Sequence, residues 1–153
     1  MNVKLRRATR ARAASVFENL RWDDQREVDT AGNFRTTDER TEVLLAGWKA
    51  SKVSYAIEVD GRTVAVLGLV PTPLANVVWM LCTDDVRLAP KAVLQRCIDV
   101  ADKWHRRYGT LLCVSDNRNA LHQRWIRRVG FTKHGEVDQN GFPFTQYLYR
   151  GRR

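Results

Sequence analysis

The sequence predicts a single α/β domain spanning residues 1–153, with a mixed and partly antiparallel sheet. Segments with strand-like and helix-like periodicity follow one another along the whole chain, which is typical of this class. No repeat, low-complexity tract or Gly/Ser-rich linker divides the 153 residues, and this length suits one domain. A content of 44% hydrophobic and 28% charged residues excludes a disordered or collagen-like chain.

The first part of the chain predicts a strand followed by two helices. We expect a short strand at Asn2–Arg7 and then a helix over Arg10–Leu20, for which Thr9 is the N-cap. The polar segment Arg21–Phe34 contains a glycine and no apolar periodicity, so we expect a loop there. A second helix is expected to begin at Thr37, where acidic residues precede an apolar face.

The middle of the chain predicts three strands. Tyr55–Val59 and Thr63–Val70 flank the pair Asp60–Gly61, which is a strong signal for a two-residue hairpin turn. A further strand is expected at Val77–Thr83. The apolar runs of these strands are far too short to cross a bilayer, so we expect no membrane span.

The last part predicts two more helices with a strand between them. Pro90 suits the first position of a helix that reaches about Tyr108, because its missing N–H would have no helical partner there. A buried strand is expected at Leu111–Ser115, and a helix from Asn119 to Gly130. A closing hairpin is expected from Phe131–Val137 and Phe144–Tyr149. The prediction is therefore six to seven strands and four helices.

The net charge of +9 is distributed unevenly along the chain. Residues 22–42 carry seven acidic and three basic side chains, a net charge of −4. The basic surplus falls on residues 1–21 and on the two helices predicted after residue 87. Such a surplus indicates anionic partners, such as nucleic acid or an acidic cofactor.

Cysteine and histidine residues predict neither disulfides nor a metal site. Cys82, Cys97 and Cys113 lie in apolar stretches and form no ligand spacing, so we interpret them as buried thiols in a reducing compartment. The three histidines lack the pair spacing of a metal site, and no metal is expected.

Two segments carry a resemblance to a known family. The loop Arg87–Ala92 follows a strand and opens a helix, and Asn119–Phe131 ends in Val-Gly-Phe. Together with the order of elements, they resemble the GNAT superfamily of acetyl-CoA-dependent N-acetyltransferases. The resemblance implies a GNAT-like fold in which backbone N–H groups at the helix start bind the pyrophosphate of acetyl-CoA. The cofactor-binding residues it implies are Val86, Arg87, Lys91, Ala92 and Asn119.

Two residues depart from the GNAT pattern. Pro90 stands where the family has its first glycine, so the loop has lost one N–H donor. Ile126 stands where the family often has a tyrosine that acts as general acid, and isoleucine cannot donate a proton. These departures predict a degenerate acetyl-CoA site.

A second resemblance covers roughly residues 77–150. The residues that carry it are Trp79, Thr83–Asp84, the loop Arg87–Ala92, Lys103–Tyr108, Asn119 with His122, Arg124 and Ile126, and Glu136 with Gly141. These residues resemble the small internal virion proteins of short-tailed bacteriophages, which are themselves GNAT-like. The resemblance implies a phage protein of the host bacterial cytoplasm or the virion, with other virion proteins and packaged DNA as partners.

For catalysis, an amine nucleophile needs a base, and the sequence offers Asp84 or Asp85 at the end of a strand. The alternative is that one of them caps a turn or pairs with Arg87. The main expectation is therefore a virion-associated or assembly protein with a degenerate acetyl-CoA site. An active N-acetyltransferase acting on an amine, with Asp84 as base, stays open. So does a nonspecific DNA-binding accessory protein, because the basic helices could contact phosphates.

Overall fold

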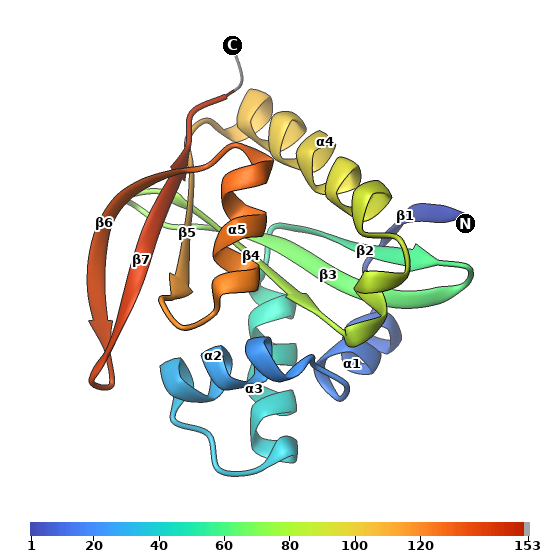
Figure 1. Ribbon diagram of the computed structural model, residues 1–153, viewed down its shortest axis with the longest axis horizontal. Coiled ribbons are helices and arrows are strands. Elements are labelled where there is room, and N and C mark those ends of the chain that lie inside the picture. Colours follow the sequence, from blue (N-terminus) through green and yellow to red (C-terminus); the bar gives the residue numbers. More distant parts are fainter. Residues whose placement is uncertain (152–153) are drawn as a thin grey trace.

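The computed structural model describes residues 1–151, which form a seven-stranded sheet and five α-helices (Figure 1). The elements are β1 (Val3–Arg7), α1 (Arg10–Phe17), α2 (Trp22–Gly32), α3 (Thr37–Ala50), β2 (Val53–Val59), β3 (Arg62–Pro71), β4 (Asn76–Cys82), the 3₁₀ helix η1 (Asp84–Leu88), α4 (Pro90–Tyr108), β5 (Leu111–Asp116), α5 (Ala120–Val129), β6 (Thr132–Gln139) and β7 (Phe142–Tyr149).

The predicted strands and their turns are confirmed. The turn between β2 and β3 has φ values of 49° at Asp60 and 83° at Gly61. Asn140 and Gly141 repeat this pattern between β6 and β7, with φ values of 52° and 88°. Two successive positive φ values are what a two-residue hairpin turn of type I′ requires, and this turn type matches the twist of the flanking strands. Each turn therefore fixes the register of the pairs beside it, and the register shifts further along, at Ile57–Glu58 in β2 and between Lys133 and Gly135 in β6.

One predicted element is wrong. The segment Arg21–Phe34 was expected to be a loop, but residues Trp22–Gly32 form α2, so there are five α-helices instead of four. The helix buries Asp24 and Glu27 in place of an apolar face, and apolar periodicity therefore does not reveal it. The first helix is also shorter than predicted, because it ends at Phe17.

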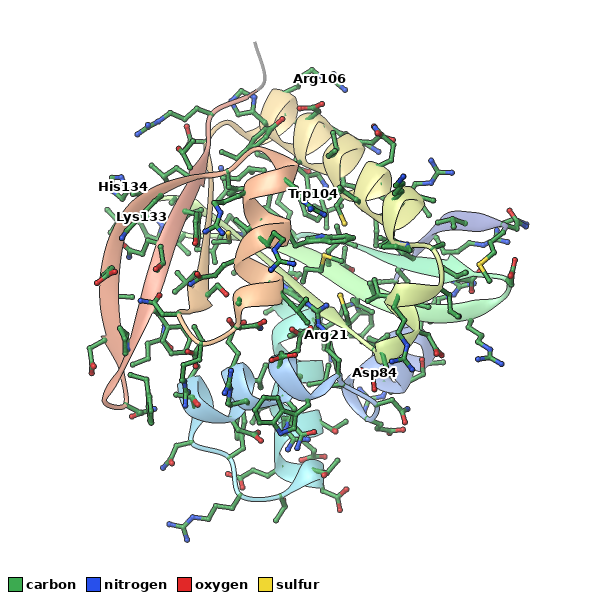
Figure 2. The ribbon with its side chains drawn as sticks, viewed as in Figure 1. Arg21, Asp84, Trp104, Arg106, Lys133 and His134 are labelled. Atoms are coloured by element: carbon green, nitrogen blue, oxygen red, sulfur yellow. The ribbon has the colours of Figure 1, made fainter. Side chains whose placement is uncertain are left out.

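Helices cover both faces of the sheet. On one face, α4 and α5 pack their apolar sides on the strands, and Trp104 of α4 is buried there (Figure 2). On the other face, α1 and α3 pack against β2, β3 and β4 through residues that include Phe17 and Leu45. These two layers form the core, and the three cysteines are free and buried within the fold, as predicted.

The strand order is β1-β2-β3-β4-β5-β7-β6, and β4 and β5 are the one parallel pair in the described sheet. They pair only through Asn76 with Leu111 and Val77 with Leu112, and the rest of each strand diverges from the other. The sheet is therefore split at its centre. The two strands pair at their amino ends, and the gap between them opens toward their carboxyl ends. None of the helices within residues 1–151 has the length and apolarity needed to cross a bilayer.

Candidate active site

The split between β4 and β5 exposes a strand edge inside the molecule. Thr83 N–H donates to the carbonyl of Val64 on β3 at 2.9 Å, so this residue directs its backbone groups toward β3. Backbone groups alternate in direction along an antiparallel strand. Those of Cys82, Met80 and Val78 therefore point away from β3 and into the split.

Helix α2 closes the open end of this split with two carboxylates. Asp24 accepts a hydrogen bond from Cys82 N–H of β4 at 2.9 Å. Glu27, three residues later on the same helical face, accepts from Asp116 N–H of β5 at 2.6 Å and from the Ser115 hydroxyl at 2.7 Å. Buried backbone N–H groups need partners, and here side chains replace the missing bonds between strands. We call this arrangement the carboxylate clip of Asp24 and Glu27.

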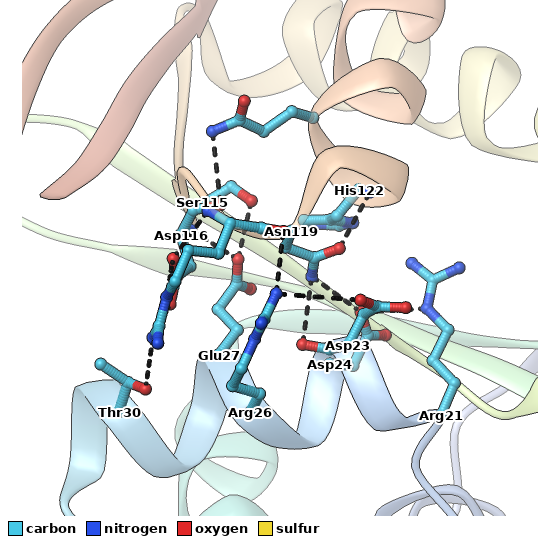
Figure 3. A network of polar contacts seen from close by, with 12 residues as sticks. Arg21, Asp23, Asp24, Arg26, Glu27, Thr30, Ser115, Asp116, Asn119 and His122 are labelled. Carbon is cyan, nitrogen blue, oxygen red and sulfur yellow. Dashed lines mark hydrogen bonds and ion pairs between the residues drawn. The ribbon is translucent and has the colours of Figure 1, made fainter. Parts of the chain in front are cut away.

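Further polar contacts fix α2 to the end of β5 and the start of α5 (Figure 3). Arg21 forms an ion pair with Asp24 at 3.0 Å, and Asn119 donates its side-chain amide to Asp24 at 3.2 Å. Arg26 donates to the carbonyl of Arg118 at 2.8 Å. The clip is therefore the centre of a network that joins three separate stretches of chain.

A cavity of about 450 Å³ passes through the split and is lined from both faces of the sheet. On the face of α4 and α5 its lining residues include Cys97, Val100, Trp104, His122, Ile126 and Val129. On the other face they include Phe17, Val28, Leu44, Gly47, Trp48 and Trp79. Glu27 also lines the cavity, and its side chain extends from α2, whose Val28 and Ala31 line the second half, to Ser115 and Asp116 at the end of β5 (Figure 3). We call the second half, between α2, α3 and β4, the α2–α3 chamber.

Glu27 is a buried carboxylate with an altered proton affinity. Burial raises the pKa of Glu27, although His122 and the hydrogen bonds from Ser115 and Asp116 act in the opposite direction. A carboxyl group whose pKa is raised by burial inside a cavity is a common feature of general bases and acids. Glu27 is therefore the best-placed proton acceptor that the cavity contains.

Three buried nitrogen atoms of residues that line the cavity have no hydrogen-bond partner among residues 1–151. They are Nε1 of Trp104, in a residue 3% exposed, Nδ1 of His122, in a residue 7% exposed, and Nε1 of the half-buried Trp125. An unpaired polar group in the interior is costly, so such atoms often mark places where a ligand binds. The half of the cavity under α4 and α5 therefore offers polar groups to a bound molecule.

The start of α4 has the features of an anion site. Ala89, the N-cap residue, provides no side-chain cap, and the first hydrogen bond runs from Val93 N–H to the Ala89 carbonyl at 3.0 Å. The N–H groups of Lys91 and Ala92 precede that bond, while Pro90 has none. Arg87 is exposed in η1 immediately before the helix, so positive charge accompanies the free donors.

Three other predicted site residues, Val86, Asn119 and Asp84, have surroundings that differ from those the sequence predicted. Val86 is buried in the core beside β3, and its N–H bonds the Thr83 carbonyl at 3.3 Å. Asn119 is fully buried, and its side-chain oxygen Oδ1 caps α5 by accepting from His122 N–H at 3.1 Å. Asp84 is exposed in η1 and does not line the cavity.

The neighbouring carboxylate of the predicted pair, Asp85, contacts Arg62 at 3.6 Å and not Arg87. Within the described residues, no group of three His, Cys, Asp or Glu side chains is arranged to hold a metal ion.

Sequence reasoning missed Glu27, which the structure places in the cavity. The sequence predicts a loop at residues 21–34, and a loop predicts no fixed side-chain positions. Glu27 was therefore not among the predicted site residues. The available signal was the acidic pattern itself, since Asp24 and Glu27 are spaced to share one face of a helix. The concentration of negative charge in residues 22–42 belongs to the same signal.

Comparison with known proteins identifies the fold. No family model and no curated protein sequence matches the chain. Among solved structures, it is similar to the ribosomal alpha-N-protein acetyltransferase RimL in complex with coenzyme A, with a TM-score of 0.69 and 18% identity over 99% of this chain and 95% of that one. It is also similar to the aminoglycoside acetyltransferase AAC(6')-Ib with coenzyme A, with a TM-score of 0.67 and 16% identity, over 97% and 95% of the two chains.

A third similar structure is an acetyltransferase of the GNAT family from Streptococcus pneumoniae. Its TM-score is 0.64 at 12% identity, and the match covers 99% of this chain and all of that one. Identities this low establish the fold and leave the activity to be argued from the site. The split sheet with helices on both faces is therefore the single-domain α/β fold of the GNAT acetyltransferases, as the resemblance in the sequence implied.

Proposed function

We propose that the protein is an acetyl-CoA-dependent N-acetyltransferase that acts on a primary amine, with Glu27 as the general base. The observation that carries this proposal is the position of Glu27. It is a buried carboxylate in the cavity at the split of the sheet, between a half under α4 and α5 and the α2–α3 chamber. A group in that position can contact reactants entering from either half.

The residues present fit acetyl-CoA. The N–H groups of Lys91 and Ala92, with the positive charges of Arg87 and Lys91, would hold the pyrophosphate. The exposed edge of β4 at Met80 would pair with the amide groups of the pantetheine arm, and Trp104 Nε1 would donate to a carbonyl of that arm. The bound cofactor supplies an acetyl group activated as a thioester. Pro90 removes one donor from the site and leaves the others in place.

Glu27 has the properties that an amine acceptor requires. A primary amine is largely an ammonium ion near neutral pH and must lose a proton before it can attack a carbonyl carbon. The Glu27 carboxylate can hold the ammonium by charge and take that proton at the oxygen that is free of the clip. Its raised pKa improves it as a base, provided that the pH is high enough to ionise it.

A second proton site lies across the cavity on α5. Ile126, at the position expected for a general acid, is buried and lines the cavity without a polar atom. His122 precedes it by one helical turn on the same face and also lines the cavity. Its unpaired Nδ1 can hold a proton there. We therefore assign the acid role to His122 in place of Ile126.

The proposal is tested by comparing Glu27→Gln with Asp84→Asn, because Asp84 was the base predicted from the sequence. Glutamine keeps the oxygen that accepts from Ser115 and Asp116, so the fold is retained while the base is lost. Thiol release from acetyl-CoA in the presence of an amine is expected to fall about 10²- to 10⁴-fold in Glu27→Gln. Asp84→Asn is expected to keep wild-type activity. The opposite result would assign the base to Asp84.

The virion or assembly role rests on the sequence resemblance alone and stays a prediction. The same applies to phage virion proteins and packaged DNA as partners and to a location in the host bacterial cytoplasm or the virion. Neighbouring capsid, tail or internal-core genes would support this role. DNA binding that falls steeply with salt would support the phosphate contacts of the basic helices.

A further inference from the structure

We infer that the acceptor is a small primary amine carried on an apolar, preferably aromatic, body, and that it binds in the α2–α3 chamber with its ammonium group on Glu27. This inference rests on the proposed function and specifies its substrate class. It excludes polyhydroxylated amines and peptide N-termini as preferred acceptors.

The lining of the chamber is apolar. Its walls are formed by Phe17 of α1, Val28 and Ala31 of α2, Leu44 and Trp48 of α3, and Trp79 of β4. Of the described residues that line the whole cavity, Glu27 alone carries a carboxylate. A ligand in the chamber therefore meets one site for a positive charge and hydrophobic side chains around it. This combination suits an ammonium group attached to a hydrocarbon body.

The two tryptophans of the chamber have no donor left for a ligand. Trp48 Nε1 donates to the Ser54 hydroxyl at 3.1 Å, and Trp79 Nε1 donates to the Ser51 hydroxyl at 3.0 Å. Gln139 also lines the cavity with a neutral polar side chain, so a ligand with several hydroxyl or peptide groups would lose more bonds to water than the cavity could replace. Each such group costs about 1–3 kcal/mol when it is buried unpaired. A sugar amine, with several hydroxyls, is therefore disfavoured more strongly than an amine with one aromatic ring.

Charge around the chamber favours a cation. Residues 22–42, which form α2 and the start of α3, carry a net charge of −4, whereas the whole chain carries +9. Exposed carboxylates of α3, among them Asp38, Glu39 and Glu42, belong to this segment. Surface charges act over about 8–10 Å at physiological salt, so these carboxylates attract small cations to this side of the molecule. The anionic cofactor is expected at the opposite, basic side, at the start of α4.

Gly47 leaves space at the wall of the chamber. It is exposed on α3 and lines the cavity, and a Cβ atom added there would meet no atom within 4 Å. A larger side chain at this position can therefore project into open space without displacing the core. A larger side chain at residue 47 is therefore a way to reduce the volume of the chamber at its α3 wall without changing Glu27 or the start of α4.

The test compares three acceptors with wild-type protein and acetyl-CoA: phenethylamine, glucosamine and a tripeptide with a free N-terminus. Phenethylamine is expected to have a kcat/KM about 100-fold higher than either of the others. Gly47→Phe is expected to raise the KM for phenethylamine about tenfold or more, with the affinity for acetyl-CoA unchanged in a calorimetric titration. Gly47→Ala is the matched control and is expected to keep the wild-type KM.

The outcomes separate the two proposals. If glucosamine or the tripeptide is acetylated and phenethylamine is not, the inference about the acceptor is overturned while the acetyltransferase proposal stands. If acetyl-CoA binds and none of the three amines is acetylated, both are overturned. An unchanged KM in a Gly47→Phe variant that still melts like the wild type would remove the chamber as the acceptor site.

Discussion

Removing Asp24 is expected to destabilise the protein strongly, because this side chain holds the open end of the split sheet. Asp24 is 1% exposed and accepts from Cys82 N–H, while it also pairs with Arg21, whose side chain is 12% exposed. In Asp24→Ala, the N–H would lose its acceptor and the guanidinium would stay buried without a counter-charge. Breaking one side of a buried ion pair costs about 3–5 kcal/mol.

For a chain of this length, that cost corresponds to a fall in melting temperature of about 6–20 °C. Thermal unfolding followed by circular dichroism measures it directly. The double variant Arg21→Leu with Asp24→Ala is expected to regain part of the loss, because no unpaired charge then remains buried. A fall of less than about 2 °C in Asp24→Ala would show that Asp24 does not hold the open end of the split sheet. Strict additivity of the two single changes would contradict that role as well.

Three further predictions concern stability and reactivity. Burial raises the pKa of Glu27, so the folded protein binds its proton more tightly than the unfolded chain, and this contribution to stability is lost as the pH rises through the folded-state pKa. The melting temperature of Glu27→Gln should therefore rise relative to that of the wild type as the pH increases above about 4, the ordinary pKa of a glutamate side chain. Gly68→Ala should lower the free energy of unfolding by about 1–3 kcal/mol, because the new Cβ would lie 2.6 Å from the Trp79 ring. Burial raises the pKa values of the three thiols, so a thiol reagent should modify them only after unfolding, as counted by absorbance; these are Cys82, Cys97 and Cys113.

The sequence predicted the elements that follow apolar periodicity and local caps. The strands, the turn at Asp60–Gly61 and the helix that begins at Pro90 all have such local causes. Helix α2 was not predictable in this way, because its buried positions are Asp24 and Glu27. Their burial makes sense only when the split sheet provides N–H groups for them, and that information lies in strands about 60 and 90 residues further along the chain.

The residues of the candidate site also fall into a group that local sequence predicts and a group that it does not. The basic start of α4 could be predicted from Arg87 and Lys91, because an anion site at a helix start depends on local sequence. The cavity, the unpaired Nδ1 of His122 and the position of Glu27 depend on how β4 and β5 separate. Pairing between distant strands is not encoded in any one segment, so the base was placed at Asp84 instead.

Binding of acetyl-CoA is the most direct test of the account, because every proposed role depends on a cofactor at the start of α4 and in the split. Wild-type protein, Lys91→Glu and Arg106→Glu can be titrated with acetyl-CoA by calorimetry. Arg106 is the matched control, because it is an exposed residue in the last turn of the same helix, at the end opposite to Asp84 and η1 (Figure 2).

Acetyl-CoA is expected to bind the wild type saturably and one to one, about tenfold or more weakly after Lys91→Glu and with little change after Arg106→Glu. No binding to the wild type at millimolar acetyl-CoA, or equal weakening by the two charge reversals, would contradict it.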